Sequence, residues 1–204
     1  MRQVIIGLGS GRCGTMSLAH LFDIQDGCGC THEEYNTDRL SLRWKDDLFV
    51  LPYAVINLLL NYEETVGDVG WYWLNYVPFI VGYIPNVRFV CLQRDRDETI
   101  DSYRRRRDNQ IAMFGPDGAN SPMFPMYQQY DNIPPDEKLA LYYDEYYAQA
   151  ESHEKFYPNN FRIFSIENLN TEEGQKEILD FAGFKNHRYK VGVKLNANPN
   201  GGKD

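Results

Sequence analysis

The apolar residues of this 204-residue chain form short continuous runs and longer, spaced patterns that alternate along the sequence. Continuous runs at residues 4–8, 87–92 and 161–166 predict buried strands, and residues 28–31 are a candidate for a further short strand. Apolar residues at helical spacing predict helices at about residues 15–24, 37–60, 71–84, from 97 onward, 135–157 and 171–182. Residues 61–70 read as a polar connector.

Length and composition fit one globular domain with a sizeable core. Hydrophobic residues make up 43% of the chain and charged residues 25%, which is an ordinary balance for a folded protein. We therefore expect residues 1–204 to form a single three-layer α/β domain, in which helices flank a mainly parallel central sheet.

The charge of the chain argues against one class of partner. A formal net charge of -8 does not suit a general nucleic-acid binder, which needs a basic surface. Basic residues gather instead in one stretch, residues 94–107. This distribution favours a single anionic ligand held by an acidic protein.

Targeting and cysteine usage suggest a cytoplasmic protein. Met1 to Gln3 lead directly into the first strand, without a separate cleavable apolar segment, and the apolar run at 48–60 is too short to span a membrane. Cys28 and Cys30 could chelate a metal or oxidise. Because no second pair of ligands accompanies them, we expect small buried thiols in a reducing compartment.

The most informative stretch is a glycine-rich loop between the first strand and the first helix. Residues 7–14 contain four glycines, and Arg12, Thr15 and Ser17 add a cation and two hydroxyls. Glycines let backbone N–H groups turn toward a ligand, and the start of a helix contributes partial positive charge. The stretch predicts a phosphate site, and the alternative is a tight strand-to-helix turn without a ligand.

The loop departs from the pattern of nucleoside triphosphatases, which have Lys and then Ser or Thr after the second glycine. Here Thr15 and Met16 occupy those two positions, and the cation lies earlier, at Arg12. The stretch resembles the loop of sulfotransferases that use 3′-phosphoadenosine-5′-phosphosulfate (PAPS), which reads Lys/Arg-x-Gly-Thr-Thr/Ser. The resemblance implies that the cofactor's 5′-phosphosulfate is bound by Gly11, Arg12, Cys13, Gly14, Thr15, Met16 and Ser17. Met16 stands where the family often has a second hydroxyl.

A second block of the same family follows the strand predicted at 87–92. Sulfotransferases have Arg-Asp-Pro there, and the Arg and a Ser eight residues later hold the 3′-phosphate of the cofactor. Arg94 and Ser102 have that spacing, whereas Arg96 replaces the usual Pro. Guanidinium and hydroxyl groups suit phosphate oxygens on chemical grounds as well. The alternative is that Arg94 caps or forms a salt bridge at the end of the strand.

A general base is expected at the end of the strand predicted at 28–31, where His32, Glu33 and Glu34 follow one another. In open α/β sheets, ligands bind at the carboxyl ends of strands, so these residues should face the phosphate loop. The acceptor hydroxyl must lose a proton as it attacks sulfur. We favour Glu33 as the base, with His32 and Glu34 as alternatives. Glu33 and Glu34 could instead begin a helix at its positive end.

Three further regions carry weaker signals. Residues 104–107 are four consecutive arginines, which cannot all face one site, so we expect most of them to be solvated or paired with acids. Residues 109–135 lack periodicity and predict a substrate or lid loop, and the alternative is a partly disordered surface loop. In the basic tail, Lys190 and Lys194 are candidate ligands of the 3′-phosphate, and residues 198–204 are expected to be flexible.

A third block, residues 166–169 and 179–184, matches the fold markers of the family, so that the resemblance runs from about residue 4 to residue 184. It implies a P-loop-type fold and transfer of a sulfuryl group from PAPS to a hydroxyl or amine of a small-molecule or glycan acceptor. The product would be 3′,5′-adenosine bisphosphate. Arg12 would stabilise the leaving oxygen, Glu33 would take the proton, and no metal would be needed. An atypical P-loop kinase or hydrolase and a non-catalytic PAPS-binding protein remain alternatives.

Overall fold

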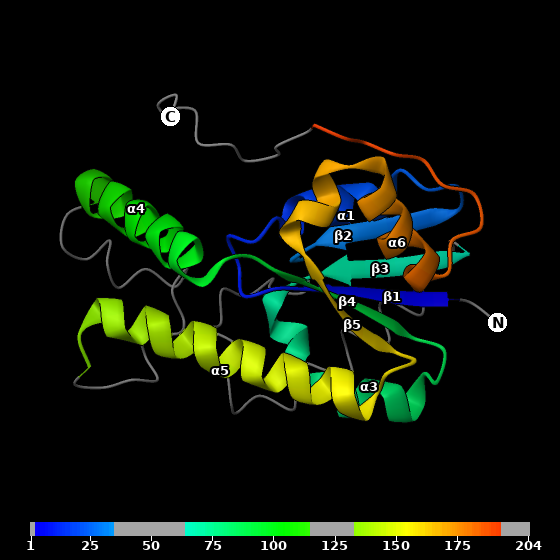
Figure 1. The fold of residues 1–204 in the computed structure, drawn as a ribbon, viewed down its shortest axis with the longest axis horizontal. Helices are drawn as coiled ribbons and strands as arrows, with labels where there is room; N and C mark the ends of the chain where they lie inside the picture. Colours follow the sequence, from blue (N-terminus) through cyan, green and yellow to red (C-terminus); the bar gives the residue numbers. More distant parts are fainter. Residues whose placement is uncertain (1–2, 35–63, 115–132, 193–204) are drawn as a thin grey trace.

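The computed structural model describes residues 3–34, 64–114 and 133–192, and these residues contain a parallel five-stranded sheet. Its strands lie in the order β2-β3-β1-β4-β5, and all four pairings between neighbours are parallel. The strands are β1 Gln3–Leu8, β2 Cys28–His32, β3 Thr65–Val69, β4 Arg88–Gln93 and β5 Phe161–Ser165. The predicted parallel sheet is confirmed (Figure 1).

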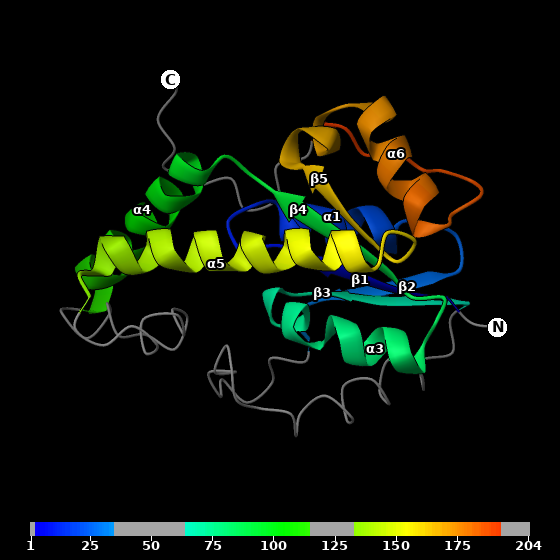
Figure 2. The same cartoon turned by 60° about the horizontal axis from the view of Figure 1, so that its bottom comes forward.

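Helices cover both faces of this sheet. The α-helices are α1 Thr15–Asp23, α3 Val77–Tyr83, α4 Arg96–Phe114, α5 Pro135–Phe156 and α6 Glu172–Ala182, and the 3-10 helices are η1 Trp71–Tyr76 and η4 Ile166–Asn170. Helices α1 and α6 lie on one face, and α3 and α5 lie on the other (Figures 1 and 2). The expected three-layer α/β architecture with flanking helices is therefore confirmed.

Strand β1 shows how the sequence dictates the layers. Side chains of a strand alternate between its two faces, so a strand covered on both faces must be apolar throughout. Val4, Ile6 and Leu8 pack in the core on the α5 side, and Ile5 packs in the core on the α1 side. All four are fully buried. The glycine loop that follows β1 thus starts from a fully buried strand.

One strand was not predicted from the sequence. Residues 61–70 were interpreted as a polar connector, but Thr65–Val69 form β3, which lies between β1 and β2. Its Thr-Val-Gly-Asp-Val sequence lacks an apolar run, yet Asp68 is fully buried. A Cβ at Gly67 would lie 2.6 Å from the carbonyl oxygen of Ile5, so glycine permits the close approach of β1. Val66 and Val69 pack in the two cores, and tertiary hydrogen bonds compensate the buried carboxylate that interrupts the apolar pattern.

The loop predicted at residues 109–135 was placed too widely. Helix α4 continues to Phe114 and α5 begins at Pro135, so the prediction is wrong for residues 109–114 and for Pro135. Residues 133–134 are not helical, and 115–132 lie outside the described residues. The helix expected at 71–84 is divided into η1 and α3. The helix predicted at 37–60, together with Lys194 and the tail at 198–204, also lies outside the described residues.

The start of α6 offers a simple test of the fold. Thr171 is the N-cap of α6, and its Oγ1 accepts a hydrogen bond of 3.0 Å from the backbone N–H of Gly174. Replacing Thr171 by Ala should lower the free energy of unfolding by about 1 kcal/mol, because one N–H at the helix start loses its acceptor. Thr171→Ser keeps the acceptor and serves as the control in urea unfolding. Equal stability of the Ala variant and the wild type would contradict the assignment.

Candidate active site

The glycine loop between β1 and α1 has the backbone shape of an anion site. Gly11 and Gly14 both have a φ of 85°, and Arg12 between them has a φ of 58°. Left-handed residues in succession turn backbone N–H groups to one side, which creates a concavity for an anion. Gly14 is the N-cap of α1 and has no side chain to cap it, so the first N–H groups of the helix have no side-chain acceptor.

Tyrosines from α4 and α5 hold this loop in place. The carbonyl oxygen of Ser10 accepts hydrogen bonds from the hydroxyls of Tyr103, at 2.5 Å, and Tyr142, at 2.9 Å. The N–H of Gly9 donates to the Tyr146 hydroxyl over 3.0 Å. Together these contacts fix the loop just before its left-handed residues. A Cβ at Gly11 would overlap the hydroxyl of Tyr103, which explains the glycine.

The tyrosines that hold the loop, and Cys13 within it, are in their neutral forms. Burial raises the pKa of Tyr103 and of Tyr146, so both phenols keep their protons at neutral pH. Burial also raises the pKa of Cys13 to about 11, and its side chain is fully buried in the core. Of the predicted cofactor-binding residues, Cys13 can therefore present only its backbone to a ligand.

The predicted base segment ends near the start of α1. Nε2 of His32 lies 3.2 Å from Oγ1 of Thr15, which is buried, whereas Met16 and Ser17 are partly exposed. Glu33 follows β2 with a φ of 53°, and its N–H donates to the carbonyl of Val69 at 3.0 Å. The end of β2 thus contacts the first residue of α1 through His32 and Thr15.

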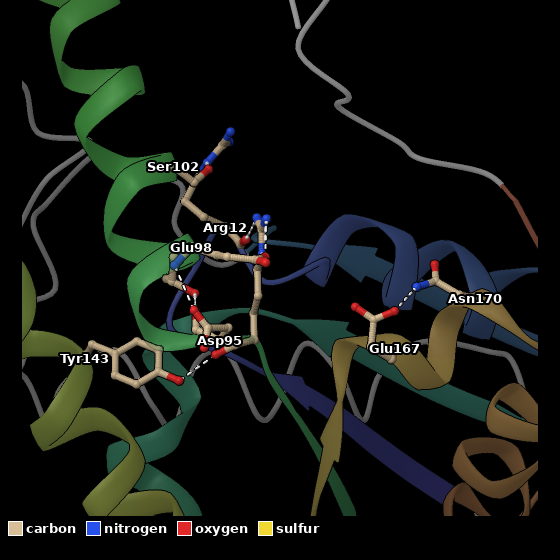
Figure 3. Close-up of polar contacts among 9 residues, drawn as sticks. Arg12, Asp95, Glu98, Ser102, Tyr143, Glu167 and Asn170 are labelled. Carbon is tan, nitrogen blue, oxygen red and sulfur yellow. Dashed lines mark hydrogen bonds and ion pairs between the residues drawn. The ribbon is translucent and has the colours of Figure 1, made fainter. Parts of the chain in front are cut away.

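The two anion sites predicted from separate motifs adjoin one another. Nε of Arg12 donates to Oγ of Ser102 over 3.1 Å, and Arg94 reaches the carbonyl oxygen of Arg12 at 3.4 Å (Figure 3). Arg94 also forms an ion pair of 2.8 Å with Glu98, so the alternative of a salt bridge at the strand end is present too. The structure therefore brings together Arg12, Arg94 and Ser102.

Local hydrogen bonds place Arg94 and the start of α4. Oδ1 of Asp95 accepts from the N–H of Glu98 at 3.0 Å, as an N-cap does. The hydroxyl of Tyr143 donates to the carbonyl oxygen of Arg94 at 2.5 Å. Helix α4 carries Ser102, and Arg94 lies in the short connection between β4 and α4. Glu167 and Asn170, paired with each other at 2.6 Å, belong to η4 (Figure 3).

The arginine run divides between two environments. Arg107 and Arg104 pair with Asp136 of α5, at 2.7 Å and 3.3 Å, and Arg107 chiefly lowers the pKa of that carboxyl. Arg106 lies one helical turn after Ser102, on the same face of α4. Burial lowers the pKa of Arg12, and the charge of Arg106 is the next cause. Positive charge therefore collects around Arg12.

This division predicts unequal effects of arginine substitutions. Arg106→Ala should weaken binding of 3′,5′-adenosine bisphosphate roughly tenfold, because one charge beside the anion site is lost. Arg104→Ala, whose side chain is exposed and pairs with Asp101 and Asp136, should change the affinity less than about twofold. Isothermal titration calorimetry measures both. Equal losses in the two variants would contradict the division.

Comparisons with solved structures agree with the fold. A sulfotransferase from Alicyclobacillus acidocaldarius superposes with a TM-score of 0.61 at 14% sequence identity, covering 97% of this chain and 87% of that one. A shikimate kinase from Bacteroides thetaiotaomicron gives a TM-score of 0.49 at 12% identity, covering 88% of this chain and 96% of that one. Neither protein-family models nor curated sequences gave a match. At these identities the likeness concerns the fold alone.

The described residues contain no group of three or more His, Cys, Asp or Glu side chains that could hold a metal ion. Among their helices, none combines the length and the apolar character needed to cross a membrane. The four cysteines all lie in described segments and form no disulfide, and Cys28 and Cys30 pack in or against the core on the α1 side.

Proposed function

We propose that the protein is a sulfotransferase that moves a sulfuryl group from PAPS to a hydroxyl or amine acceptor. The observation that carries the proposal is the contact of Arg12 with Ser102 and of Arg94 with the loop. Two anion-binding motifs that lie some 80 positions apart in the sequence thereby adjoin at the ends of β1 and β4. A nucleotide with phosphates at both its 5′ and 3′ positions suits such a double site.

Each residue has a chemical task in this proposal. The backbone N–H groups of residues 11–15 and the Arg12 guanidinium stabilise charge on the phosphate oxygen that leaves sulfur. Arg94 and Ser102 hold the 3′-phosphate and so fix the register of the nucleotide. Glu33 takes the proton from the acceptor's hydroxyl or amine. At the same time the oxygen or nitrogen of the acceptor forms a bond to sulfur, and the bond between sulfur and the phosphate oxygen breaks. The electron pair of that bond leaves with 3′,5′-adenosine bisphosphate.

A kinase or hydrolase of the P-loop type is the second candidate. Its loop would need a Lys at the position of Thr15 and a hydroxyl for magnesium at the position of Met16, and both are missing. The cation at Arg12 and the contact with Ser102 favour the bisphosphate nucleotide over a triphosphate. A third candidate, a non-catalytic protein that binds PAPS, shares the whole site and differs only in turnover.

Binding measurements separate the first two candidates. We expect 3′,5′-adenosine bisphosphate to bind without magnesium, and Arg94→Ala to weaken this binding roughly tenfold or more, because a charge-assisted contact is lost. ATP serves as the matched ligand without a 3′-phosphate and should bind much more weakly. Binding of ATP only with magnesium, and no binding of the bisphosphate, would refute the sulfotransferase and favour the kinase.

Turnover tests the role of Glu33 and separates the third candidate. Glu33→Gln should lower the rate of adenosine bisphosphate release from PAPS, with a panel of hydroxyl and amine acceptors, about a hundredfold or more. The affinity for the bisphosphate should stay unchanged. Glu34→Gln tests the alternative base: it should lower the rate far less than Glu33→Gln if Glu33 accepts the proton, and a larger loss than in Glu33→Gln would assign the base to Glu34. Full activity of Glu33→Gln would contradict the assignment of the base.

A further inference from the structure

A fully buried carboxylate, Asp68, has no role in the function described so far. It lies on β3 and accepts four hydrogen bonds. Its Oδ1 accepts from Oγ1 of Thr31 at 2.7 Å and from the N–H of Glu34 at 3.3 Å. Its Oδ2 accepts from the hydroxyl of Tyr72 at 2.5 Å and from Nε1 of Trp73 at 2.7 Å. Four donors replace the water that a buried carboxylate loses.

The two oxygens of Asp68 serve different parts of the fold. Oδ2 binds η1, which belongs to the core on the α5 side. Oδ1 binds residues 31 and 34, which bracket the candidate catalytic pair His32 and Glu33. Thr31 and Asp68 are also register partners of adjacent strands. One side chain therefore links the rigid centre of the sheet to the segment that carries the expected base.

The bracketed segment needs such support because of its backbone. Glu33 has a φ of 53°, a left-handed conformation that is uncommon for residues other than glycine. Its own N–H is held by the carbonyl of Val69, and the N–H of the next residue is held by Asp68. Residues in such conformations persist where the surrounding contacts determine them, and they cluster at functional sites.

We propose that Asp68 is a positioning residue for the general base: through Thr31 and the Glu34 N–H it fixes the backbone of the segment that carries Glu33. This inference rests on the proposed function, because it assigns a purpose to the position of Glu33. Asp68 itself does not touch the reacting atoms. Its effect should appear in the rate of the chemical step and not in nucleotide binding.

Variants of the donors test the proposal better than variants of Asp68. In Asp68→Asn the amide would place an NH₂ group against either the Glu34 N–H or the Trp73 Nε1, so the fold itself could fail. Thr31→Val and Tyr72→Phe each remove one hydroxyl donor from the same carboxylate. The first lies on the side of the base and the second on the side of η1. Thr31→Ser restores the hydroxyl and serves as the rescue variant.

Two readouts are measured on the whole protein: hydrogen exchange of the Glu34 amide by NMR, and kcat and KM for PAPS with the acceptor panel. Thr31→Val should speed the exchange and lower kcat roughly tenfold with an unchanged KM for PAPS, because a loosened base is misplaced. Tyr72→Phe should leave both readouts within about twofold of the wild type, since its hydroxyl donates to Oδ2 of Asp68 and not to the oxygen that binds residues 31 and 34. Thr31→Ser should behave like the wild type.

Results that overturn the role of Asp68 differ from results that refute the proposed function. Unchanged exchange of the Glu34 amide in Thr31→Val would overturn the proposal whatever the activity, because the Thr31 hydroxyl would then not orient the carboxylate oxygen that accepts the Glu34 N–H. Equal losses of kcat in Thr31→Val and Tyr72→Phe would also overturn it and leave Asp68 a purely structural role. A wild-type protein that releases no adenosine bisphosphate from PAPS would instead refute the proposed function, and the exchange measurement, which needs no turnover, tells the two failures apart.

Discussion

The arrangement of the site depends on two hydrogen bonds, which the hydroxyls of Tyr103 and Tyr142 donate to the carbonyl oxygen of Ser10. The loop that follows contains Arg12 in a left-handed conformation, a state that costs about 1–3 kcal/mol and persists only when neighbours enforce it. Tyr103 comes from α4, and Tyr142 and Tyr146 come from α5. The glycine loop near the start of the chain is therefore held in place by residues from its second half.

The same logic extends to the two flanks of the loop. On one side Arg12 contacts Ser102 of α4, and Arg94 at the end of β4 contacts the backbone of Arg12. On the other side β3 places Asp68 between β1 and the segment that carries Glu33. Each flank joins a charged side chain to a strand end of the same sheet. The parallel sheet thus gathers groups that lie far apart in the sequence at one edge.

The sequence predicts what depends on local pattern. The strands at 4–8, 87–92 and 161–166, the loop glycines and the spacing of Arg94 and Ser102 are all readable, because hydrophobic runs and turn chemistry act over a few residues. Strand β3 was missed because Asp68 interrupts its apolar pattern. The buried carboxylate is stabilised by hydrogen-bond donors on β2 and η1, and these contacts cannot be read from the sequence. The tyrosines of α5 were assigned to an apolar helix face, and only the three-dimensional structure shows that their hydroxyls bind the loop. The hint that was available is their spacing, at positions 142, 143, 146 and 147.

A crystal structure of the protein with 3′,5′-adenosine bisphosphate would test the proposed double anion site most directly. We predict one phosphate against the backbone N–H groups of residues 11–15 and the other between Arg94 and Ser102, with the Arg12–Ser102 hydrogen bond exchanged for contacts to the ligand. The tyrosine contacts to Ser10 should be unchanged, because the loop is already in its binding conformation. A nucleotide bound elsewhere, or a loop that must be rebuilt to accept it, would contradict the central claim that these residues form a preorganised double anion site.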